Sequence, residues 1–159
     1  PREYSSAASD VYKRQIRTIG TAGGTGYAVE FAGSYIRNIS MEARMTICNM
    51  SIEAGAKVGL VSVDDKTIEY VKKHSNLEAN LINDAIKKWK NLTTDKEAMF
   101  DKEIDIDVSK INPQVSWGTS PEMVIDFNEK IPSSSIFSAE KRKSLDQLKI
   151  IWDCQIIRN

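Results

Sequence analysis

Hydrophobic and polar positions alternate along this chain with two different periods. Residues 41–58 and about 78–92 place apolar side chains three and four positions apart, which predicts helices with one buried face. Residues 60–64 and 103–111 instead alternate with period two, which predicts strands. A further helix is expected over 139–149. Helices and strands that follow one another in this way indicate an α/β fold.

Local signals predict where some of these elements begin and end. Ser40 is a suitable N-cap for the helix over 41–58, and Gly59 is a suitable C-terminal stop. Asp65 is expected to cap the next helix. Residues 112–124 contain two prolines and a glycine around a short apolar segment, which predicts a strand that enters a shaped loop.

The two ends of the chain differ from its middle. Residues 1–15, PREYSSAASDVYKRQ, are rich in serine, alanine and charge and show no clear period, which predicts a disordered leader or non-native sequence. The string SSAASDVYKRQ also resembles a tag found at the ends of translated environmental sequencing reads. The folded region is therefore expected over 16–145, with a tail at 146–159.

Composition excludes several classes of function. The 159 residues carry 22 Lys and Arg against 22 Asp and Glu, so no net positive charge favours nucleic acid or an anionic membrane. No uncharged apolar run approaches the roughly 20 residues needed to cross a bilayer, and we expect a soluble, cytoplasmic protein. Cys48, Cys154 and the single His74 support neither a disulfide framework nor a self-contained zinc site.

One polar stripe on the helix over 41–58 is the main candidate site. Its members follow at steps of four, three, four and four residues: Glu42, Thr46, Asn49, Glu53 and Lys57. A solvated outer face explains such a stripe. If the face lies inside what the sequence around it predicts to be a largely buried helix, Glu53 needs a partner, because an unpaired buried carboxylate costs several kcal/mol.

The remaining candidates have simpler explanations. The glycine-rich stretch 20–26 matches neither a Walker loop nor a dinucleotide fingerprint, which favours a structural turn that lets two elements pack closely. His74 is expected on a helix surface beside two lysines. Strand alternation explains Asp105 and Asp107 without a metal, and Cys48 is expected to behave as a small core residue.

Three stretches together resemble a known family. GTAGGTGYAVEFAGS, SMEARMTICNMSIEAGAKVGLV and QVSWGTSPEMV are similar, in order and spacing, to the large subunits of 3-isopropylmalate dehydratase, in the aconitase superfamily. The resemblance covers about Ile16 to about Leu145. It implies that the chain is a fragment of an aconitase-type α/β/α multi-domain subunit.

The resemblance also implies a chemistry. Members of this family interconvert 2- and 3-isopropylmalate in leucine biosynthesis, by dehydration and rehydration at an open iron of a [4Fe-4S] cluster, and they work as heterodimers with a small subunit. An Asn-Met-x-x-Glu motif faces the cluster in such enzymes. Carried over to this sequence, Asn49 lies near the cluster and Glu53 hydrogen-bonds the hydroxyl or water that is lost and regained.

Departures from the family pattern limit that implication. The Gly-Ser-Cys-Thr-Asn and C-x-x-C motifs that supply the cluster cysteines are absent, as is the Asp-Ser-His motif, and Cys154 matches none of them. We therefore expect an internal fragment that is inactive alone. Homoaconitase or another aconitase-type hydro-lyase is an alternative within the class. A non-catalytic α/β module that binds an anion at its glycine-rich turn is an alternative from another class.

Overall fold

The computed structural model describes residues 2–118 and 120–132, and its mixture of helices with small sheets confirms the α/β class. Some of the predicted helices and strands are present in the structure, with several shifted bounds. In chain order the elements are α1 (Arg2–Ile19), β1 (Ala28–Glu30), α2 (Ser34–Asn38), α3 (Met41–Met50), the 3₁₀ helix η1 (Ser51–Ala54), β2 (Val58–Leu60), α4 (Asp65–His74), α5 (Ala79–Trp89), the 3₁₀ helix η2 (Val108–Lys110), β3 (Gln114–Ser116) and β4 (Val124–Asp126).

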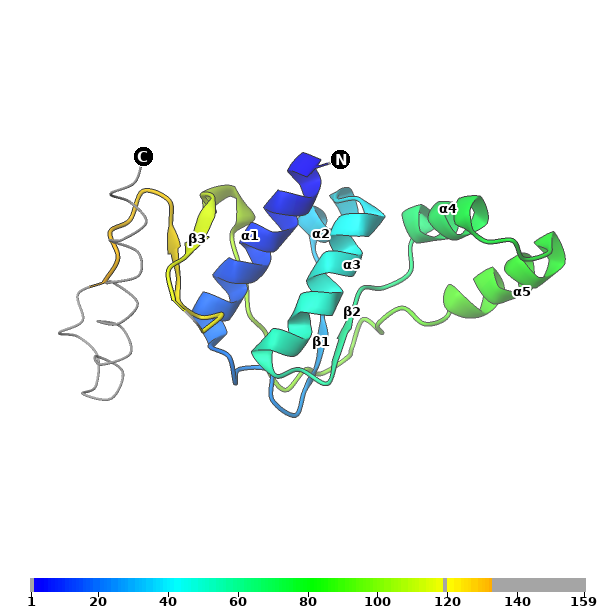
Figure 1. The fold of residues 1–159 in the computed structure, drawn as a ribbon. Coiled ribbons are helices and arrows are strands. Elements are labelled where there is room, and N and C mark those ends of the chain that lie inside the picture. Colours follow the sequence, from blue (N-terminus) through cyan, green and yellow to red (C-terminus); the bar gives the residue numbers. More distant parts are fainter. Residues whose placement is uncertain (1, 119, 133–159) are drawn as a thin grey trace.

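Helices α1 and α3 lie side by side at the centre of the molecule (Figure 1). Strands β1 and β2 form a parallel pair beside α3, with Val29 opposite Gly59. The antiparallel hairpin of β3 and β4 packs against α1, while α4 and α5 extend on the opposite side (Figure 1). The main core lies between α1, α2 and α3 and consists of Ala8, Ile36, Ile39, Ala43 and Ile47.

Residues 2–15 belong to helix α1, so the expectation that this segment is disordered is wrong. Ala8, Tyr12 and Ile16 follow at intervals of four residues and are at most 1% exposed, so one face of the helix is buried. Serine and charged residues between these positions conceal the period in the sequence. The suggestion that the segment is non-native stays a prediction.

Helix α3 begins where predicted and ends earlier. The Ser40 hydroxyl accepts a hydrogen bond from the Ala43 backbone N–H at 3.2 Å, which confirms the predicted N-cap. After Met50 the α-helix is followed by the tighter 3₁₀ helix η1, which ends at Gly55. The φ of Gly55 is 81°, a left-handed conformation that favours glycine. Gly59, the predicted stop, lies within β2 instead.

The strand predictions are partly wrong. The strand expected over 60–64 is misplaced: β2 spans Val58–Leu60, so only Leu60 is shared and residues 61–64 form no strand. Asp64 rather than Asp65 caps α4, by accepting from the Thr67 backbone N–H at 3.0 Å. Residues 103–111 form no strand: among the described residues no neighbouring strand pairs with them, and alternation alone cannot satisfy backbone hydrogen bonds.

The remaining predictions have mixed outcomes. The helix expected over about 78–92 is confirmed as α5. Residues 112–124 contain strand β3 and the loop that leads into β4, as predicted. The helix expected over 139–149 and the tail at 146–159 lie outside the described residues.

Candidate functional site

The three stretches that carry the family resemblance meet in space. The Gly24 backbone N–H donates to the Ala54 carbonyl oxygen at 2.8 Å, which joins the glycine-rich stretch to η1. Three residues before Gly24, the Thr21 N–H donates to Oε2 of Glu122, in the loop between β3 and β4, at 3.4 Å. The glycine-rich stretch therefore lies between the other two, as a contact between elements rather than as a phosphate loop.

Glycine avoids crowding at this contact, where the two backbones approach closely. A Cβ atom on Gly24 would lie 3.0 Å from the Ala54 carbonyl oxygen and 3.2 Å from Ala56. One on Gly55 would lie 2.5 Å from Oγ1 of Thr25. The interpretation of residues 20–26 as a structural turn for close packing is confirmed.

Asn49 and Glu53 are both exposed to solvent. Only one face of the segment formed by α3 and η1 is buried, the face that carries Ile47, Ser51 and Ala54. The expectation of a largely buried helix around Glu53 is therefore wrong. Among the described residues, no hydrogen bond or ion pair holds the Glu53 carboxylate. Burial therefore does not force Glu53 to have a partner.

The predicted polar stripe is interrupted at the end of α3. Residues four apart are neighbours on an α-helix, but in a 3₁₀ turn residues three apart are eclipsed. Because η1 begins at Ser51, Glu53 is rotated away from Asn49 and lies nearer the direction of Met50. Lys57 follows the left-handed Gly55 and lies on no helix. The structure places Asn49 and Glu53 on adjacent elements rather than in one continuous row.

Tyr12 packs against η1, a contact that the sequence did not predict. Its side chain packs with Ile16 and Ala54, and its buried hydroxyl has no hydrogen-bond partner among the described residues. Burial raises the pKa of Tyr12, and the nearby negative charge of Glu53 raises it further. The only sequence signal was the interval of four residues to Ala8 and Ile16.

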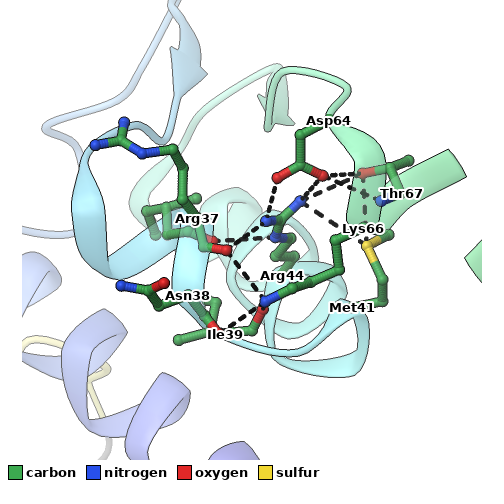
Figure 2. A network of polar contacts seen from close by, with 9 residues as sticks. Arg37, Asn38, Ile39, Met41, Arg44, Asp64, Lys66 and Thr67 are labelled. Carbon is green, nitrogen blue, oxygen red and sulfur yellow. Dashed lines mark hydrogen bonds and ion pairs between the residues drawn. The ribbon is translucent and has the colours of Figure 1, made fainter. Parts of the chain in front are cut away.

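A second polar cluster, which sequence reasoning also missed, surrounds Arg44 (Figure 2). Arg44 is 2% exposed, and its guanidinium donates to both oxygens of Asp64, at 2.7 and 2.6 Å. It also donates to the carbonyl oxygens of Ile36 and Arg37, each at 3.0 Å, and to the Thr67 hydroxyl at 3.3 Å. The hydrogen bond from Arg44 is the main reason why the pKa of Asp64 lies well below its usual range.

Lys66 of α4 also belongs to this cluster and contacts the C-terminal end of α2. Its ammonium donates to the carbonyl oxygens of Arg37, Asn38 and Ile39 at 3.1, 2.8 and 2.8 Å, as Figure 2 shows. Cations at a helix C-terminus satisfy its free carbonyl groups and complement its dipole. The cluster joins α2, α3 and α4, and its polar groups are used by one another, which gives it a structural role.

The other predicted residues lie apart from Glu53. His74 is exposed at the end of α4, stacks on Tyr70 and makes a 2.8 Å hydrogen bond to the Tyr70 carbonyl oxygen, so the predicted surface histidine is confirmed. Asp105 and Asp107 are exposed outside any strand. Asp107 accepts from the Ser109 N–H at 3.1 Å and pairs with Lys110 at 2.8 Å.

The residues present do not fit an iron–sulfur cluster. The sequence contains two cysteines, whereas the family motif needs three. Cys48 is half-buried, and burial raises its pKa, which favours the thiol over the thiolate that binds metals. In the described part of the chain no three His, Cys, Asp or Glu side chains gather as a metal site. Cys154 lies outside that part.

Comparison with protein families gives a consistent classification. Residues 3–153 match the aconitase family (aconitate hydratase), and the chain belongs to that family. The match is wider than the span of 16–145 expected from the three stretches. At the family level it indicates an aconitase-type hydro-lyase, a class whose members generally bind a [4Fe-4S] cluster. Over residues 2–118 and 120–132, no helix is both long and apolar enough to span a membrane.

Proposed function

We propose that this chain is a segment of the large subunit of a 3-isopropylmalate dehydratase, acting with a small subunit in the cytoplasm. Membership of the aconitase family supports the reaction class. The observation that carries the proposal further is the meeting of the three resembling stretches around the glycine-rich turn, next to Glu53.

Within this proposal Glu53 acts on the hydroxyl group that the substrate loses. Its carboxylate is exposed and has no partner among the described residues, so it is free to accept a hydrogen bond from that hydroxyl or to exchange a proton with water. Asn49 lies four residues before it, at the end of α3, and offers an amide that both donates and accepts hydrogen bonds. The two cysteines of this chain do not hold a cluster, so other segments of the intact enzyme are to supply it.

The test uses the full reading frame that contains this chain, co-expressed with its small subunit and reconstituted with iron under anaerobic conditions. Alkene formation from 3-isopropylmalate is followed by absorbance. Glu53→Gln should lower the rate by roughly 10²–10⁴-fold, the usual contribution of a positioned acid or base. Near-normal turnover in this variant would exclude the proposed role.

Glu42→Gln provides the matched control. Glu42 is also exposed and undergoes the same change of charge, but it lies in the first turn of α3, whereas Glu53 lies in η1 beyond the last turn of that helix. Its substitution should leave the rate unchanged. An enzyme that converts homoaconitate in preference to isopropylmalate would keep the hydro-lyase class and refute the substrate.

A further inference from the structure

Glu53 has no side-chain partner among the described residues, so its direction depends on the backbone of η1. That turn has four residues, and two backbone hydrogen bonds from the residues after it close its C-terminal end. The Gly55 N–H donates to the Ile52 carbonyl oxygen at 2.9 Å, and the Ala56 N–H donates to the Ser51 carbonyl oxygen at 3.3 Å. A four-residue 3₁₀ turn with such bonds needs support from outside to hold one conformation.

The glycine-rich stretch and the residue after it support the chain on the C-terminal side of Glu53. Gly24 donates to the Ala54 carbonyl oxygen at 2.8 Å, directly after Glu53. Three residues further on, the Lys57 N–H donates to the Tyr27 carbonyl oxygen at 2.9 Å. Ala54 is 1% exposed, so water does not compete readily for the bond from Gly24.

We propose that Gly24 is a positioning residue for Glu53: its bare Cα allows the hydrogen bond to Ala54 that fixes the turn from which the carboxylate projects. The effect of Gly24 on catalysis rests on the function proposed for Glu53. Its effect on the conformation of η1 does not. Positioning of a reacting group to a fraction of an ångström has large effects on rate, since a misplacement of about 1 Å can cost about 10²-fold.

Gly24→Ala is a mild test of this role. Gly24 has an ordinary backbone conformation, so alanine introduces no strain of φ. Its Cβ would lie 3.0 Å from the Ala54 carbonyl oxygen, which forces the turn to move by a few tenths of an ångström. We expect about a tenfold fall in kcat with little change in KM.

Gly26→Asn is the matched control in the same stretch. Gly26 has φ of 88°, a conformation that asparagine tolerates better than most residues, and nothing lies within 4 Å of its Cβ position. This variant perturbs the loop without pushing on η1. Its kcat should stay near that of the parent enzyme.

Two measurements on the intact, reconstituted enzyme decide the matter. Hydrogen–deuterium exchange of the peptide spanning 51–57 should quicken in Gly24→Ala and not in Gly26→Asn. In a double-mutant cycle, Gly24→Ala should have no further effect on kcat once Glu53→Gln is present. Unchanged exchange in Gly24→Ala, or rate losses that simply multiply, would overturn the positioning role.

Failure of the proposed function has a different signature. If Glu53→Gln alone keeps full turnover while Gly24→Ala still quickens exchange over 51–57, the contact is mechanical only. The catalytic role of Glu53 is then refuted, and with it the positioning of a catalytic group.

Discussion

Replacing Asp64 with asparagine should destabilise the fold through Arg44. Asparagine keeps the size of the side chain and an oxygen that can still accept from the Thr67 N–H, so the N-cap of α4 is preserved. The change removes the negative charge that faces a buried guanidinium. The loss in free energy of unfolding then reports on the ion pair rather than on the cap.

The exposure of the two partners sets the magnitude. Removing one partner of a fully buried ion pair costs about 3–5 kcal/mol, whereas exposed pairs contribute about 0.2–1 kcal/mol. The Arg44 side chain is 3% exposed and that of Asp64 is 34% exposed, so this pair lies between the two cases. Water can replace part of what Asp64 provides, and we expect a loss of about 2 kcal/mol.

Equilibrium unfolding in urea, followed by far-UV circular dichroism, measures this loss as a shift of the midpoint at constant slope. Asp84→Asn is the control, since Asp84 and Lys87 form a pair with side chains 71% and 80% exposed, and its midpoint should not change. If Asp64→Asn unfolds with the midpoint of the parent protein, the Arg44 cluster does not stabilise the fold and the reasoning is wrong.

Two further outcomes follow from individual groups. Arg44 lowers the folded-state pKa of Asp64, so the stability that Asp64 contributes is complete above its ordinary pKa of about 3.9 and is lost as the pH falls below that value. The free energy of unfolding, measured in urea at successive pH values, should therefore decrease less steeply below pH 4 in Asp64→Asn than in the parent. Ser40→Ala should cost about 1 kcal/mol in urea unfolding, through loss of its bond to the Ala43 N–H, and Ser40→Asp should restore it; an alanine variant as stable as the parent would show that this cap contributes nothing.

Much of the candidate site could be predicted from local sequence. Asn49 and Glu53 were proposed from their spacing and from the family resemblance, and the glycine-rich stretch was interpreted as a close-packing turn, which the Gly24–Ala54 contact confirms. Their roles in catalysis stay predictions. The direction of Glu53 was not predictable, because it depends on the change from α to 3₁₀ geometry after Met50.

Other contacts could not be predicted, because their partners are distant in the sequence. Tyr12 approaches η1 only when α1 packs beside α3. Arg44 finds Asp64 twenty residues further along the chain, and a single sequence gives no sign of which charges will pair. The β-like alternation over 103–111 was misleading, since a strand needs a neighbour and alternation does not show whether one is present.

The sequence by itself determined the α/β class, the cap at Ser40, the helix α5 and membership of the aconitase family. These properties depend on side-chain period and on bonds between residues close along the chain. The tertiary structure decided the rest. It determined where α3 ends and η1 begins, that Glu53 is exposed, and that Gly24 contacts Ala54 in η1. The contact between Gly24 and Ala54 depends on two segments distant in the sequence coming within 3 Å of one another, where a Cβ atom on Gly24 would crowd the Ala54 carbonyl oxygen.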